Sequence, residues 1–306
     1  MGAEEHRMKC AIVRAIWTGG TQMALITNQA ALTYQGVTVH SNITTGRLMQ
    51  ALTAEKTAVD GTYTLGDEIS FAISLMNAGT VELENLTVTD DLGAFQLESE
   101  TLYPLTYQTE TLRYFINGVL QPAPALASEA PLTIEGITVP AGGCAMLLYE
   151  AVVTELADRQ AGACITNTAV ITGTGISDPV SAQETIFAQE APELSITKAM
   201  NPTLVQAGGQ VCYTLTVLNT GNQPVAAADG AVVSDTFNPV LKNLNVTLDG
   251  ETVQRGVQYS YDEQSGLFAT LPGAIAVDAA TFAQDPATGA WTVTPGAVSI
   301  VVTGTL

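Results

Sequence analysis

Three kinds of polar residue stand in phase with apolar neighbours in this chain. In Leu52-Thr-Ala-Glu-Lys56 and Leu194-Ser-Ile-Thr-Lys198, strand alternation turns each lysine to the same side as its leucine. The same alternation turns two acids and two asparagines inward: Asp90, Asp235, Asn28 and Asn167. Burying such groups without partners is costly, so we expect a lysine, an acid and an asparagine to meet in each core.

This set of residues could form a spontaneous isopeptide bond. Desolvation lowers the pKa of a lysine and makes its amine nucleophilic, while a carboxyl group shuttles protons as the asparagine loses ammonia. Within one domain, Lys56 and Asn167 would react beside Asp90. Between two copies of the chain, Lys198 would react with Asn28 beside Asp235.

A non-covalent arrangement explains the same residues and is the more common one. A lysine at a strand end can extend its amine to water, and an asparagine can hold a turn by hydrogen bonds. Asn77 and Asn219, in Asn-x-Gly segments, are predicted to be turn residues of this kind.

The elements that would position these residues occur twice. One unit begins at Leu52 and the other at Leu194, and four further segments match in the same order: 66–71 with 208–213, 77–79 with 219–221, 86–90 with 231–235, and 115–118 with 247–250. The last pair ends in Asn-Gly and Asp-Gly, which favour tight hairpins. The turn spacing predicts two β-sandwiches, at 51–192 and 193–306.

The second unit lacks the last two strands of the first. Ile165-Thr-Asn-Thr-Ala-Val-Ile-Thr172 and a strand around 180–186 close the first unit, whereas the second ends with a strand at 298–304. Near the start of the chain, Ile26-Thr-Asn-Gln-Ala-Ala-Leu-Thr33 repeats the first of these, and 37–45 follows a turn at Gln35-Gly36. We therefore expect 23–50 to be a donor segment. Its donor-strand residues would be Ile26, Asn28, Ala30, Leu32, Tyr34, Val37 and Val39.

A sandwich without these strands exposes an apolar groove and unpaired edges, and a strand from another subunit would cover both. The segment could instead fold back onto its own second unit, or pair loosely with the edge of the first. Because the link from Thr45 to Leu52 is too short to pass the first domain, donation to a neighbour is favoured. Such an interface is heterologous and gives an open filament or a closed ring.

Composition narrows the function further. The chain has 306 residues, of which 46% are hydrophobic and 13% charged, enough for two cores. Abundant Thr, Val, Ala and Gly without long amphipathic helices predict an all-β protein. A net charge of -20 argues against nucleic acid and anionic membranes as partners.

Candidates for cofactor or catalytic chemistry are weak. No CxxC spacing occurs and the chain has two histidines, His6 and His40, so neither a zinc site nor a Ser-His-Asp set is expected, and no cofactor. Free thiols are expected for the cysteines, and Cys10 is the one most available for an intermolecular disulfide.

Residues 1–22 show no clear strand or helix pattern and are expected to be an N-terminal extension or flexible arm, with Met23 as a candidate natural start. The chain shows no secretory core and no apolar run of membrane-spanning length, which leaves the export route open.

The segments from Lys56 to Asp90 and from Lys198 to Asp235 resemble the conserved-repeat family, a domain of unknown function found in tandem in bacterial surface proteins. The resemblance lies in the Lys, Gly-Asp, Tyr-x-hydrophobic, Asn-x-Gly and Thr-Asp pattern. The opening Met-Ala-Leu-Ile-Thr-Asn-Gln-Ala30 and the ending Val-Thr-Gly-Thr-Leu306 also resemble the ends of such proteins from anaerobic Gram-positive bacteria.

This resemblance implies immunoglobulin-like sandwiches, an extracellular structural setting and no enzymatic activity. The sequence thus predicts a structural subunit of an extracellular filament that assembles with itself by strand donation. The alternative is a monomeric or wall-associated adhesin that binds a host or glycan ligand.

Overall fold

A computed structural model describes residues 23–34, 37–49 and 51–306. These residues form β-strands joined by turns, with one 3₁₀ helix, η1 (Ala227–Asp229), so the prediction of an all-β fold is confirmed. The chain divides into two compact units, which meet in sequence at Phe187 and Ala188, and Arg159–Gly162 belongs to the second unit.

The first unit contains a sandwich of two antiparallel sheets. One has the order β13-β12-β16-β7-β5, with β11 beside β16, and the other has the order β14-β15-β8-β17-β18-β6. The strands of the first sheet are β5 (Leu52–Ala58), β7 (Glu68–Asn77), β11 (Leu105–Tyr107), β12 (Arg113–Ile116), β13 (Val119–Gln121) and β16 (Cys144–Val153). Those of the second are β6 (Thr62–Tyr63), β8 (Leu83–Asp90), β14 (Ala125–Glu129), β15 (Leu132–Val139), β17 (Cys164–Thr172) and β18 (Val180–Ala188), and a separate pair is formed by β9 (Phe95–Leu97) and β10 (Glu100–Leu102).

Alternation of buried and exposed residues builds the core of this sandwich. Strand β7 buries every second residue from Ile69 to Leu75, and β17 does the same from Ile165 to Ile171. Each sheet thus turns one apolar face inward.

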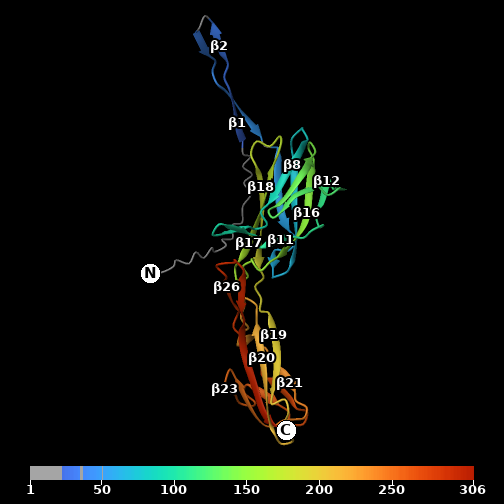
Figure 1. Ribbon diagram of the computed structural model, residues 1–306, viewed down its shortest axis with the longest axis vertical. Coiled ribbons are helices and arrows are strands. Elements are labelled where there is room, and N and C mark those ends of the chain that lie inside the picture. The colour runs from blue at the N-terminus through green and yellow to red at the C-terminus, as the bar shows by residue number, and fades with distance from the viewer. Residues whose placement is uncertain (1–22, 35–36, 50) are drawn as a thin grey trace, which may run out of the picture. The chain divides into compact units, whose positions relative to one another are not determined.

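The second unit has a five-stranded sheet of order β19-β20-β28-β22-β23 and a three-stranded sheet of order β21-β25-β24. Strands β19 and β20 lie side by side in the first of these (Figure 1). The strands are β19 (Leu194–Asn201), β20 (Gln210–Asn219), β21 (Ser234–Thr236), β22 (Lys242–Leu248), β23 (Glu251–Thr252), β24 (Tyr259–Tyr261), β25 (Leu267–Thr270) and β28 (Gly296–Thr305), with a separate pair of β26 (Thr281–Gln284) and β27 (Trp291–Thr294). Phe237, Phe268 and Ile300 lie in its core.

The two units correspond strand by strand, up to a point. In the first sheet of each unit, the corresponding strands are β5 and β19, β7 and β20, β16 and β28, β12 and β22, and β13 and β23. In the second sheet, they are β8 and β21, β15 and β25, and β14 and β24. Within the second unit as described, nothing matches β17, β18 or β6. Strand β21 is therefore an edge strand, whereas β8 is paired on both sides.

The predicted hairpin turns are confirmed in both units. Asn117 and Gly118 connect β12 to β13, and Asp249 and Gly250 connect β22 to β23. All four have positive φ, between 48° and 87°, as a two-residue hairpin turn requires.

The N-terminal segment pairs with itself. Strand β1 (Met23–Asn28) lies antiparallel to β4 (Thr44–Met49), and β2 (Ala31–Tyr34) lies antiparallel to β3 (Val37–His40). Two continuous strands were expected here, but three residues, 41–43, face only two, 29–30. This bulge, in which Ser41 Oγ accepts from the Ala30 amide, divides the hairpin.

Candidate functional site

The first unit brings Lys56, Asp90 and Asn167 together in its core, from β5, β8 and β17. All three are buried, and Lys56 Nζ donates to Asp90 Oδ2 at 2.6 Å. The hydroxyl of Tyr149, on β16, donates to the same oxygen at 2.6 Å and accepts from Asn167 Nδ2 at 3.1 Å. The other carboxylate oxygen accepts from the backbone amide of Leu92 at 3.1 Å. The three predicted residues thus share one cluster, and Tyr149 links the asparagine to the acid.

Burial sets the protonation of this cluster. Desolvation lowers the pKa of Lys56, and the nearby Asp90 carboxylate opposes that shift in part. Desolvation also raises the pKa of Tyr149 well above its ordinary value, and the charge of Asp90 adds to the rise. Asn167 Oδ1 is buried and accepts no hydrogen bond among the described residues.

Tyr149 was missed in the sequence, although a signal existed. The strand from Cys144 to Val153 alternates and turns Tyr149 inward with Leu147 and Ala151. A buried tyrosine needs a hydrogen-bond partner for its hydroxyl, and the inward acid was the available one.

In the second unit, the matching ion pair is partly open. Lys198 Nζ lies 2.5 Å from Asp235 Oδ2, but the lysine side chain is 41% exposed and the aspartate 15%, against 0% for both residues of the first pair. The lysine amine lies over the ring of Tyr213, 4.7 Å from its centre. Apart from this ion pair, Asp235 Oδ2 has no partner among the described residues.

The position of Tyr149 is taken by a valine in the second unit. Tyr149 is opposite Phe71 in the first sheet, and Val302 is opposite Tyr213, which matches Phe71 in the sequence alignment. Valine has no group to hydrogen-bond with Asp235 or with an asparagine amide, so the second cluster lacks the hydroxyl that bridges the first.

An apolar surface lies beside this open pair. Leu194 and Ile196 on β19 are 50% and 53% exposed, whereas Leu52, at the position of Leu194, is 3% exposed. In the first unit, the second sheet includes β17 and β18, which have no counterpart in the described second unit. We call the exposed face of β19 together with the edge of β21 the acceptor groove; it includes Leu194, Ile196, Lys198 and Asp235.

The hairpin carries apolar residues that match those of β17, but their side chains are exposed. Leu32 is 66% exposed and Val39 56%, while Ile171, at the position of Leu32, is fully buried. Asn28 and Ala30 are also exposed. The side chains of three further predicted donor residues, Ile26, Tyr34 and Val37, lie outside the description.

The two Asn-x-Gly segments form turns that fix the start of the first strand of each unit. Asn219 Oδ1 accepts from the amides of Gly221 and Glu193, next to β19, at 3.0 and 2.9 Å. Asn77 Oδ1 accepts from the amide of Gly79 at 2.9 Å, and the neighbouring amide of residue 78 donates to the carbonyl of residue 51, before β5. Their expected role as turn residues matches these contacts.

The cysteines only partly follow expectation. Cys144 and Cys212 are free thiols, but Cys164 is disulfide-bonded, so the expectation of free thiols was wrong for Cys164. Cys10, the residue predicted to form an intermolecular disulfide, lies outside the described residues.

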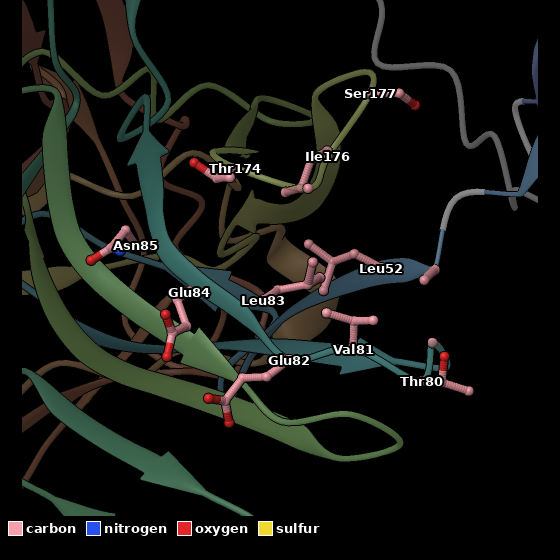
Figure 2. Close-up of a pocket in the computed structure, with 13 residues that line it drawn as sticks. Leu52, Thr80, Val81, Glu82, Leu83, Glu84, Asn85, Thr174, Ile176 and Ser177 are labelled. Atoms are coloured by element: carbon pink, nitrogen blue, oxygen red, sulfur yellow. The ribbon is translucent and has the colours of Figure 1, made fainter. Parts of the chain in front are cut away.

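A pocket of about 450 Å³ lies at one end of the first sandwich (Figure 2). Leu52 and Leu83 lie next to each other there, and Glu82 and Glu84 point away from them (Figure 2). Its lining holds no histidine or cysteine. In the described part of the chain, no three potential ligands cluster to hold a metal ion, and no helix there could span a membrane.

Comparisons with known proteins give no family. No family model and no curated protein matches the chain. Solved structures that resemble it include a family 123 glycoside hydrolase from Clostridium perfringens (14% identity, 44% of this chain and 27% of that one, TM-score 0.27). They also include the pilus backbone protein RrgB from Streptococcus pneumoniae (10% identity, 80% of this chain and 55% of that one, TM-score 0.31). A third is the major pilin subunit BcpA of Bacillus cereus (14% identity, 89% of this chain and 73% of that one, TM-score 0.34). The chain thus spans 27% and 55% of the length of the first two.

Proposed function

We propose that this protein is a structural subunit of an extracellular, pilus-like filament and that it assembles head to tail by strand donation. The hairpin at 23–50 of one copy fills the acceptor groove in the second unit of the next. The observation that supports this most is the contrast between the two units: β17 and β18 complete the first, and the described second unit leaves β21 at an edge.

The first unit supplies a register for the docked hairpin. In it, Ala169 is opposite Asp90 and Ile171 is opposite Val88 on neighbouring strands. Transferred through the sequence matches, this pairing puts Ala30 opposite Asp235 and Leu32 opposite Val233. The inward side of the hairpin then meets the exposed side chains of β19.

Burial of apolar side chains would drive this docking. Leu194 and Ile196 on the acceptor and Leu32 and Val39 on the hairpin are each at least half exposed. Fully burying one such side chain contributes about 1.5–3 kcal/mol, and pairing the edge of β21 adds backbone hydrogen bonds. Donor and acceptor are different segments of the chain, so the contact repeats from copy to copy.

Two neighbouring residues of β2 test the proposal. Leu32→Asp puts a charge on the side that enters the groove, and Thr33→Asp puts the same charge on the opposite side, where its counterpart Thr172 is exposed. We expect negative-stain electron microscopy and light scattering to show filaments or rings for the Thr33 variant and the parent, and single subunits for the Leu32 variant.

A chain that stays monomeric at every concentration would contradict the proposal and favour a monomeric adhesin. Equal assembly by both variants would mean that another surface joins the subunits. Added hairpin peptide, residues 23–50, is expected to cap the acceptor groove and shorten the assemblies.

A further inference from the structure

We propose that docking is followed by a covalent bond: Lys198 of one subunit condenses with Asn28 of the hairpin that fills its groove, and Asp235 transfers the proton. The filament is then joined by an amide at every interface. This inference rests on the proposed function, because the two side chains meet only when the hairpin of one copy enters the second unit of another.

Strand register places the two groups side by side. Asn167 lies two residues before Ala169 on β17, on the same buried side, and hydrogen-bonds within the cluster of Lys56 and Asp90. Asn28 has the same position relative to Ala30 in the repeated Ile-Thr-Asn sequence. A hairpin docked in this register brings its carboxamide to Lys198 and Asp235.

The second cluster is better arranged for reaction than the first. In the first unit, the Tyr149 hydroxyl accepts from the Asn167 amide and donates to Asp90, so it lies between asparagine and acid. In the second unit, Val302 leaves this position without a polar group. Asp235 Oδ2 has only its ion pair with Lys198, and the arriving carboxamide faces that pair directly.

Docking would also change the state of the lysine. In the described chain, the Lys198 side chain is 41% exposed, so water can reach the ion pair that it makes with Asp235. Covering an amine disfavours its charged form, as in the complete first unit, where burial lowers the pKa of Lys56. Free subunits therefore remain unreactive, and the bond forms only after docking.

The reaction needs no further reagent. The ammonium group of Lys198 gives a proton to the Asp235 carboxylate, and the neutral Nζ attacks Cγ of Asn28. As the new C–N bond forms and the bond to Nδ2 breaks, Asp235 returns its proton to the departing nitrogen and takes the one that Nζ loses. One amine and one carboxamide thus give one secondary amide and one ammonia.

The test compares native and denatured assemblies of the full-length protein. The parent is expected to give filaments by electron microscopy and a ladder of multimers on a denaturing gel after boiling with reductant. Mass spectrometry should find a joined pair of peptides carrying Lys198 and Asn28, lighter than their sum by one ammonia. Lys198→Arg keeps the charge beside Asp235 and should form filaments that give no ladder. Asn28→Ala should likewise form filaments without a ladder. Lys242→Arg, at an exposed lysine of the same unit, is the matched control and should keep both.

The outcomes separate this inference from the proposed function. Filaments that fall apart completely to single chains on boiling would overturn the amide and leave strand donation standing. A ladder that persists in Lys198→Arg would also overturn it. The absence of any assembly in the parent would contradict the proposed function itself.

Discussion

Four side chains in the first core are connected by hydrogen bonds around a single carboxylate. Asp90 accepts from Lys56, from Tyr149 and from the amide of Leu92, and Tyr149 in turn accepts from Asn167. A buried ion pair is weak evidence of stabilisation, but removing one partner is costly because a charge remains buried and unpaired. Alternation in the sequence was enough to predict that the lysine, acid and asparagine face inward. It could not predict which of them touch, since that depends on how the two sheets are aligned across the core.

Tyr149→Phe is expected to destabilise the first unit. The change removes one donor to Asp90, which still accepts from Lys56, and it leaves the buried amide of Asn167 without an acceptor, at a cost of about 1–3 kcal/mol. Urea unfolding followed by tyrosine and tryptophan fluorescence measures the difference. Tyr107→Phe is the control, because the hydroxyl of this buried residue makes no hydrogen bond with the described residues. Equal losses in the two variants would show that the bridge of Tyr149 adds nothing.

The pH dependence of unfolding in alkaline solution should show the effect of the raised pKa of Tyr149. The folded-state pKa of Tyr149 is raised well above its ordinary value of 10.0. Above the ordinary value, Tyr149 loses its hydroxyl proton in the unfolded chain but keeps it in the folded chain. The stability due to Tyr149 therefore falls as pH rises. The gap in unfolding free energy between the parent and Tyr149→Phe should therefore narrow from about pH 10 upward. A gap that widens over this range would contradict the assigned direction.

An amide within the chain, between Lys56 and Asn167, stays a prediction of the sequence. If it forms, the intact mass of a purified monomer is lower than the sequence mass by one ammonia. Lys56→Arg and Asn167→Ala should each restore the full mass. A parent monomer at full mass would show that the cluster is joined by hydrogen bonds and the ion pair alone.

At the scale of strands, the repeat in the sequence predicted most of the architecture. Matched segments gave the turns at Asn117-Gly118 and Asp249-Gly250 and the correspondence of the main strands. The alignment did not predict the length of a strand that depends on pairing with a neighbouring strand. Residues 231–235 match 86–90, yet β8 spans eight residues and β21 only three. Strand β8 is paired on both sides, whereas β21 pairs with β25 alone, and the local match between the two segments did not predict this difference in strand length.

Cysteine pairing tests the proposed register of the hairpin. Thr89 is opposite Val170 in the first unit, which places Ser234 opposite Ala31 of the donor. In a background in which the four native cysteines, Cys10, Cys144, Cys164 and Cys212, are replaced by serine, Ala31→Cys and Ser234→Cys proteins should form a mixed disulfide on oxidation. Paired strands bring the two backbones within disulfide reach.

Ser260→Cys is the control for this pairing. It lies on β24, at the far edge of the three-stranded sheet, and should stay unlinked. Equal linking at both positions would contradict the register.

At the scale of the whole chain, charge opposes assembly. Every copy carries a formal charge of -20, with 30 acidic and 10 basic residues. Subunits of one sign repel one another until screening by salt shortens the range of that repulsion. The apolar contact between hairpin and groove has no such dependence on salt.

Assembly should therefore accelerate as sodium chloride is raised. Because the Debye length falls from about 30 Å at 0.01 M to about 10 Å at 0.1 M, we expect a clear rise in the rate of light scattering over this range. Sucrose at equal osmolality serves as the control and should leave the rate nearly unchanged. Assembly that slows with salt would point to an interface of opposite charges in place of the apolar groove.

The open edge at β21 has a further consequence for how assemblies are distributed in size. In a head-to-tail filament of any length, the acceptor groove is empty at one end and the hairpin is unbound at the other. The exposed apolar surface per subunit thus falls as chains lengthen, and two short chains can remove one pair of ends by joining. The population should drift toward few, long filaments that anneal end to end, and closure into a ring would eliminate the last pair of ends.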